Sequence, residues 1–155
     1  MTSTQNWLLH DHSHYEENLS RCQDAIKSKD WDKADSIFKQ LVKDLKLHIL
    51  QEEEVVFAIY DALVKISHDP TRTLRTEHDR IISFMQEANQ FITTHDSEHG
   101  IECLRRLKDL MIKHHEKEED IFLPMAGYVL SSKREDIMDK LNASSFSESG
   151  REWNI

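Results

Sequence analysis

The feature that most constrains this sequence is an internal repeat with an offset of 66 residues. Adding this offset to a residue number in the first half gives a residue of similar chemical character in the second half. The polar pairs are His12/His78, His48/His114, Glu52/Glu118 and Glu53/Glu119, and the apolar pairs include Leu19/Met85, Leu41/Leu107 and Leu45/Met111. A repeat of this length is one supersecondary unit that needs its copy to bury its apolar face. The sequence therefore predicts two similar halves that pack against each other.

The composition favours one all-helical domain. The chain has 155 residues, which is enough for a single domain with a proper core. Its 3 Gly and 2 Pro leave little turn chemistry, and charged residues make up 32% of the chain. We predict an all-α fold, an up-down-up-down four-helix bundle built from two repeated helical hairpins, with a short fifth helix and a flexible C-terminal tail.

The helix boundaries follow from the apolar spacing and from capping residues. Asp30 and its repeat partner Asp96 are expected to cap the second and fourth helices. The bundle is expected to span residues 1–141, with repeat halves over about 5–66 and 71–130, and the Ser-rich residues 142–155 are expected to form the tail. The expected helices are 5–27, 30–66, 71–93 and 101–130, followed by a short helix over 133–141.

Histidine and glutamate occupy positions that packing would normally give to leucine. The inward-facing positions of the helices follow alternating steps of three and four residues, as in a helix bundle. In the second helix these positions are Leu41, Leu45, His48, Glu52, Val55 and Ile59, and in the fourth they are Leu107, Met111, His114, Glu118, Ile121 and Met125. His12 and His78 take equivalent inward positions in the first and third helices.

Carboxylates in such a core need a counter-charge, because a buried charge without compensation is costly. Lys and Arg are absent from these inward positions, and neutral histidine cannot balance two carboxylates, whereas metal ions can. Residues four apart on a helix share one face, so each His-x-x-x-Glu motif presents a nitrogen and an oxygen side by side. The predicted metal ligands are His12, His48, Glu52, His78, His114 and Glu118.

The ligand set limits the choice of metal. A structural zinc ion takes four ligands, usually including cysteine, and would leave two of the six unused. Calcium and magnesium prefer oxygen ligands and would not recruit four imidazoles. Two metals bridged by two carboxylates, each also held by two histidines, use all six groups. Mixed nitrogen and oxygen ligation favours two non-haem iron ions with an oxo or hydroxo bridge, and manganese is the alternative.

These motifs resemble those of the hemerythrin-like (HHE cation-binding) family over about residues 5–130. The matching elements are Asp11-His12, His48-x-x-x-Glu52-Glu53, Glu77-His78-Asp79 and His114-x-x-x-Glu118-Glu119. The resemblance implies an up-down four-helix bundle around a non-haem di-iron centre that binds oxygen, nitric oxide or peroxide.

The sequence departs from the oxygen-carrying members of that family in one position. Those members have a fifth histidine four residues from the one on the third helix, and here Leu74 and Ile82 flank His78 at that spacing. The resemblance then implies one iron with an open position, which favours reaction over reversible binding. His115 is an alternative ligand to His114, which the repeat favours.

Several other polar residues have simpler interpretations. Tyr15 is a candidate for a hydrogen bond to the site, although plain core packing is the stronger interpretation. The glutamates next to the predicted ligands in the second and fourth helices are expected on a solvated acidic face: Glu53, Glu54, Glu116 and Glu119.

Together these features predict a non-haem di-iron protein that binds and reacts with a small oxidant: oxygen, peroxide or nitric oxide. The alternative is an iron or oxygen sensor, or an iron-handling module, that acts through a protein partner. The sequence leaves open whether the reaction is catalytic. A net charge of −9 argues against nucleic acid and anionic membranes as partners. Cys22 and Cys103, expected to be buried free thiols, favour a reducing, cytoplasmic location.

Overall fold

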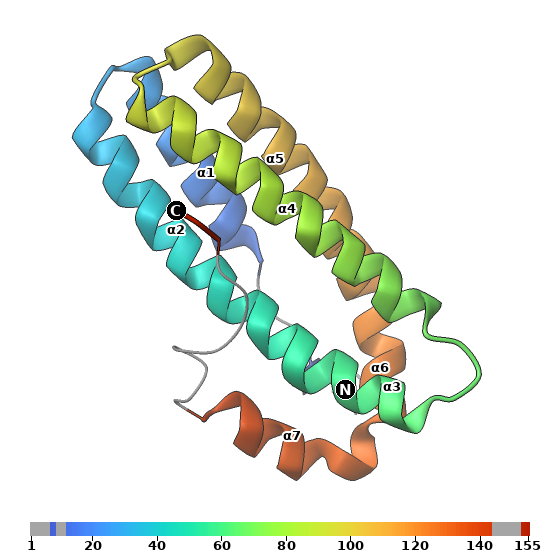
Figure 1. Cartoon of the computed structure of the whole chain (residues 1–155). Helices are drawn as coiled ribbons and strands as arrows, with labels where there is room; N and C mark the ends of the chain where they lie inside the picture. Colours follow the sequence, from blue (N-terminus) through green and yellow to red (C-terminus); the bar gives the residue numbers. More distant parts are fainter. Residues whose placement is uncertain (1–6, 9–11, 144–152) are drawn as a thin grey trace.

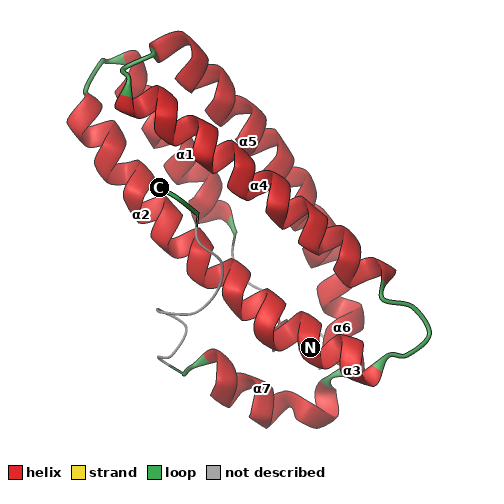
Figure 2. Cartoon of the chain, in the orientation of Figure 1, coloured by secondary structure: helices red, strands yellow, loops and turns green. Residues whose placement is uncertain are grey.

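The computed structural model describes residues 7–8, 12–143 and 153–155, and helices account for nearly all of them (Figure 2). No strand occurs among these described residues, so the predicted all-helical fold class is confirmed. The helical elements are α1 (Ser13–Lys27), α2 (Trp31–Gln51), η2 (Glu52–Phe57), α3 (Ala58–Leu63), α4 (Asp69–Thr93), α5 (Ser97–Lys117), η3 (Glu118–Phe122), α6 (Leu123–Val129), η4 (Ser131–Lys133) and α7 (Arg134–Leu141).

Two helical hairpins form the body of the molecule (Figure 1). The first hairpin pairs α1 with α2 and the second pairs α4 with α5, and α1 also packs on α5 while α2 packs on α4. The helix that starts as α2 continues without a break through η2 into α3, and α5 continues through η3 into α6. The short helix α7 lies across one end of the hairpins.

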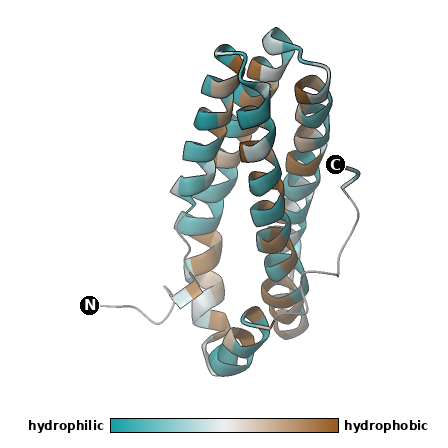
Figure 3. Ribbon diagram, turned by 90° about the vertical axis from the view of Figure 1, so that its left-hand side faces the viewer, coloured by the Kyte–Doolittle hydropathy of each residue, from teal (hydrophilic) through white to brown (hydrophobic). Residues whose placement is uncertain are grey.

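Two apolar clusters hold these helices together. The larger cluster follows the predicted repeat and includes the pairs Leu19/Met85 and Leu41/Leu107, all with 0% exposure. The second cluster lies at the end that carries α7, where Figure 3 shows many hydrophobic residues. The polar residues discussed below lie on the helices between these two clusters. Apolar packing on both sides therefore fixes the position of the site.

Each half contains one short π-helical segment, at η2 and at its repeat equivalent η3. A π-helix has more residues per turn than an α-helix. The side chains that come after it therefore point to a different side of the helix than uniform α-helical spacing predicts. Ile121 and Met125, which the α-helical spacing places in the core, are therefore 66% and 38% exposed, and Phe122 is buried instead. The prediction that Ile121 and Met125 face the core is wrong for this reason.

The turns within the two hairpins have the same geometry. Lys29 and its repeat partner His95 both adopt a left-handed backbone, with φ of 57° and 56°. The side chain of Asp30 then accepts a hydrogen bond from the backbone N–H of Lys33 at 3.2 Å, and Asp96 does the same for His99 at 3.1 Å. The two predicted helix caps are confirmed.

The left-handed turn makes a prediction about stability. A side chain with a Cβ atom is strained at positive φ, whereas glycine is not. We expect Lys29→Gly to raise the free energy of unfolding by about 1 kcal/mol. Lys27→Gly is the matched control: it lies at the end of α1 in a helical conformation and should destabilise the protein. Urea denaturation measures both changes, and a loss of stability in Lys29→Gly would contradict the argument.

The two ends of the chain differ from expectation. The first helix, predicted from about residue 5, begins at Ser13. The preceding Trp7 and Leu8 pack at the α7 end, where the Trp7 indole Nε1–H donates to the Gly127 carbonyl at 3.0 Å. Most of the predicted flexible tail lies outside the described residues. Near its end, however, Trp153 is only 3% exposed, and Gln86 Nε2 of α4 donates to its backbone carbonyl at 2.8 Å.

Two further features concern the cysteines and the apolar character of the helices. Cys22 and Cys103 are buried and free, as predicted, and burial raises the pKa of their thiols to about 12 and about 11. Within the part of the chain that the structure describes, no helix has the length and apolar character that a membrane span requires.

Candidate metal centre

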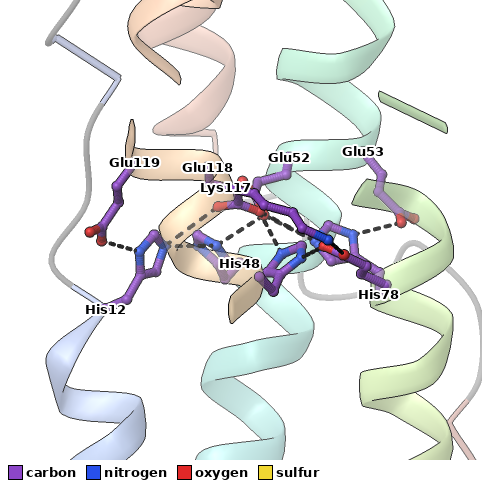
Figure 4. A network of polar contacts seen from close by, with 10 residues as sticks. His12, His48, Glu52, Glu53, His78, Lys117, Glu118 and Glu119 are labelled. Atoms are coloured by element: carbon purple, nitrogen blue, oxygen red, sulfur yellow. Dashed lines mark hydrogen bonds and ion pairs between the residues drawn. The ribbon is translucent and has the colours of Figure 1, made fainter. Parts of the chain in front are cut away.

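The fold brings the predicted ligands together, and Figure 4 shows His12, His48, Glu52, His78 and Glu118 at one level of the molecule. The ligands are His12 just before α1, His48 in α2, Glu52 at the start of η2, His78 in α4, His114 in α5 and Glu118 at the start of η3. Their side chains are buried, with exposure between 0% and 8%. Each carboxylate lies where its helix changes from α to π geometry.

The six side chains form two groups that share one carboxylate. The first contains Glu52, His78, His114 and Glu118, and the second contains His12, His48 and Glu118. In each group, one ligand atom per residue lies within 4.8 Å of all the others. Glu118 belongs to both groups, so the arrangement can hold two cations side by side.

Both carboxylates lie between histidines of different helices. Oε1 of Glu52 is 3.0 Å from Nε2 of His48 and 3.2 Å from Nε2 of His78. Oε1 of Glu118 is 2.6 Å from Nε2 of His114, and its Oε2 is 3.8 Å from Nε2 of His12. Each glutamate therefore faces one histidine from each half of the chain.

The donor atoms of the cluster suit metal ions better than they suit one another. Both oxygens of Glu52 and of Glu118, with Nε2 of His78 and of His114, are buried without a hydrogen bond of good geometry. An unsatisfied buried polar atom costs about 1–3 kcal/mol, and native proteins contain few of them. One atom from each of these four residues lies within 4.8 Å of the others, so a cation between them would satisfy them together. The residues present fit a bound metal ion.

Glutamates outside the cluster hold the far side of two histidine rings. Nδ1 of His12 is 2.6 Å from Oε1 of Glu119, and Nδ1 of His78 is 2.8 Å from Oε2 of Glu53. Figure 4 shows these two pairs at opposite sides of the cluster. Because an ionised carboxylate only accepts hydrogen bonds, each Nδ1 carries the hydrogen and each Nε2 keeps a lone pair for the centre.

The prediction that Glu53 and Glu119 belong to a solvated acidic face is therefore incomplete: their side chains are 15% and 39% exposed, but each also accepts a hydrogen bond from a ligand histidine. The repeat already contained the signal, because these two glutamates are repeat partners, as are the two histidines that they orient. The pairing crosses the halves: the histidine of each half donates to the glutamate of the other.

A third glutamate orients His114. Nδ1 of His114 is 2.8 Å from Oε1 of Glu77, and Lys117 forms an ion pair with the other oxygen of Glu77. Burial by itself would raise the pKa of Glu77, but the hydrogen bonds from His114 and Lys117 lower it to about 2. Glu77 thus stays ionised as a hydrogen-bond acceptor. Its repeat partner Asp11 lies outside the described residues.

The carboxylates also change the protonation of the histidines in the metal-free protein. Burial lowers the pKa of His114, but the close carboxylates of Glu118 and Glu77 raise it by more, so that the pKa is about 9. His78 shows the same balance, and its pKa lies well above the usual range because of Glu118, Glu52 and Glu53. Without metal, protons on these imidazoles take the place of the cations.

The raised histidine pKa values predict that a higher pH lowers the stability of the metal-free protein but strengthens metal binding. Raised histidine pKa values stabilise the metal-free fold fully below about pH 6.5, and this contribution is lost as the pH rises through about 9. Metal binding instead requires the deprotonated rings. We expect the melting temperature of the metal-free protein to fall between pH 6.5 and 9 while the increase caused by added Mn²⁺ grows. Calorimetry at several pH values measures both, and a metal-induced increase that shrinks with pH would contradict the assignment.

His115 is buried but lies in neither ligand group. Its ring stacks on that of His12 at a centroid distance of 3.8 Å and an interplanar angle of 7°. Burial first, and then the nearby His12 and His114, lower its pKa to about 2, so it is uncharged. Of the adjacent residues His114 and His115, His114 is the one whose ring contacts the carboxylates. Tyr15 packs in the core with its ring centroid 5.8 Å from that of His48.

One comparison with known proteins gives a match. The family model for the hemerythrin HHE cation-binding domain matches residues 4–126, most of the chain. This range contains the six clustered side chains and the glutamates that orient them. No curated protein and no solved structure matches the chain.

Proposed function

Because the chain belongs to the hemerythrin HHE cation-binding family, we propose that its buried cluster holds two iron ions and reacts with a small oxidant. The observation that carries this proposal is that two groups of ligand atoms share Glu118. One cation would be held by His12, His48 and Glu118, and the other by His78, His114 and the two glutamates. The long helices would form the up-down-up-down bundle that the repeat predicts.

The donor chemistry supports iron. Four imidazoles with two carboxylates are too rich in nitrogen for calcium or magnesium and too numerous for a single zinc ion. Two divalent ions bring four positive charges against two carboxylates, so the centre retains a net positive charge that attracts anionic oxygen ligands such as hydroxide. Iron with such mixed ligands and open positions supplies redox chemistry with oxygen, peroxide or nitric oxide.

The residues of this chain would have two tasks around that centre. Glu53, Glu77 and Glu119 hold the imidazole rings in one orientation and one tautomer, which keeps Nε2 available for the metals. The apolar clusters on both sides exclude bulk water from the six ligands. Leu74, one turn from His78, supplies no ligand and is buried in the apolar cluster at the α7 end.

Metal analysis combined with optical spectroscopy tests the proposal. Protein from iron-replete cells should contain close to two iron atoms per chain, because two ligand groups are present. On exposure to air, the reduced protein should develop charge-transfer absorption typical of a ferric pair. One tightly held zinc ion per chain, or no metal after iron-replete expression, would contradict the proposed function.

A further inference from the structure

A pocket of about 280 Å³ opens on the second half of the chain, between α4 and the α5–η3 helix. Leu74 and Phe122, each 3% exposed, form its inner wall, and the 66% exposed Ile121 lies at its mouth. Pro70 and Thr73 line one side, and Lys117 lies on the other. Asp69 also lines the pocket, but most of the lining surface is apolar.

The inner wall of this pocket adjoins the proposed metal centre. Leu74 lies one helical turn before His78, and Phe122 lies one turn after Glu118. Phe122 contacts Phe57 edge to face at a centroid distance of 5.3 Å, and Phe57 stacks on the His78 ring at 5.7 Å. On this path the rings of Phe122 and Phe57 lie between the pocket and the buried His78.

The repeat provides an internal comparison for the part that the structure describes, because the described residues of the first half that correspond to the pocket are covered. The repeat partner of Thr73 is Trp7, whose indole donates to the Gly127 carbonyl and lies under Arg134 of α7 at 5.6 Å. Val55, the repeat partner of Ile121, is 4% exposed.

Helix α7 completes the closure of the first half. Gln51, the repeat partner of Lys117, donates from Nε2 to the Leu141 carbonyl of α7 at 3.0 Å. Ile137 of the same helix is fully buried in the apolar cluster at the α7 end. An indole and a helix thus cover the surface in the first half, while the equivalent surface in the second half is open.

We propose that this pocket admits an uncharged diatomic gas, oxygen or nitric oxide, to the centre from the side of the second half. This inference rests on the proposed function and limits its small oxidant to oxygen or nitric oxide. Enclosed apolar cavities of about 150 Å³ bind xenon or benzene, and this open pocket of about 280 Å³ has room for a diatomic molecule against its apolar inner wall. Hydrogen peroxide would lose its hydrogen bonds to water on entering such a lining, which disfavours this route for peroxide.

Xenon tests the pocket without any metal. In the metal-free full-length protein, we expect xenon to cause saturable NMR shifts of the methyl groups of Leu74 and Thr73. Ile121→Trp should fill the pocket and abolish the shifts at Leu74, and Thr73→Trp, which copies Trp7, provides a second variant. Thr76→Trp, at an exposed position outside the pocket lining, is the matched control and should leave the shifts intact. The absence of saturable shifts in the unsubstituted protein would overturn the proposal.

Oxidation kinetics test the route. In the reduced, iron-loaded protein, we expect Thr73→Trp to slow oxidation by dissolved oxygen at least tenfold and oxidation by peroxide less than twofold. Thr76→Trp should change neither rate. Equal slowing with both oxidants, or an unchanged oxygen rate in Thr73→Trp and Ile121→Trp, would overturn the route. If no iron is bound, the proposed function fails, and the xenon shifts alone then decide whether the pocket takes up apolar gas.

Discussion

Replacement of Glu118 by alanine is expected to remove both metal ions from the purified protein, the largest effect that any single substitution should have here. Among the described residues, its carboxylate is the one side chain that belongs to both ligand groups, so neither group is complete without it. Elemental analysis should show less than 0.2 metal ions per chain, as an order-of-magnitude expectation for lost bridging ligation. The melting temperature should approach that of the metal-free protein, since a metal that binds only the folded state stabilises it.

Two further variants make this result specific. His12→Ala removes a member of the smaller group only, and it should leave about one metal ion per chain, held by the other group. Glu116→Ala changes an exposed glutamate two residues from Glu118 and should leave the metal content unchanged. A Glu118→Ala protein with two irons and an unaltered spectrum would show that the bridging assignment is wrong.

Glu53→Gln and Glu119→Gln are each expected to weaken the binding of one metal by about 10–100-fold, the magnitude typical for the loss of a partner that orients a ligating histidine. The amide keeps the size of the side chain but removes the charge that fixes the imidazole hydrogen on Nδ1 of His78 or of His12. Titration with Mn²⁺ against a chromogenic chelator measures the affinity of each site. The two substitutions should weaken different sites, because they act on histidines of different ligand groups.

Glu54→Gln is the matched control for this pair. Glu54 follows Glu53 in η2 and is exposed, so the same loss of charge occurs near the centre without a change in any histidine partner. An equal loss of affinity in Glu54→Gln would mean that the effect comes from net charge, and the proposed orienting role of Glu53 would then be wrong.

The fold class and the clustering of the six side chains could be predicted because the same information occurs twice in the sequence. A lone histidine at an inward position, such as His12, has several explanations. The same residue at the equivalent position of a second half, His78, together with two His-x-x-x-Glu motifs, limits the explanations to one shared site. The matched turns at Lys29 and His95 show that the repeat extends to the backbone conformation.

Other features depend on packing that periodicity does not describe. The sequence pattern assumed uniform α-helices, so the π-helical segments that expose Ile121 and bury Phe122 could not be anticipated. The orienting roles of Glu53 and Glu119 depend on contacts between different halves, whereas the pattern was analysed one helix at a time. The burial of Trp153 depends on how a segment remote in sequence returns to the bundle.

The hydrogen bonds that each half donates to the other bear on how such a metal centre can arise by duplication of one hairpin. A histidine of each hairpin depends on a glutamate of the other, and each hairpin supplies two histidines and one carboxylate to the cluster. One hairpin alone therefore lacks a complete centre, but two identical hairpins related by a twofold axis contain every group it needs. A gene for a single hairpin could begin as a symmetric homodimer, and its duplication and fusion would then free each copy to change independently. Trp7 and Thr73, which the 66-residue offset pairs, show how far the two copies now differ: the indole of Trp7 donates to the Gly127 carbonyl, whereas Thr73 lines an open pocket.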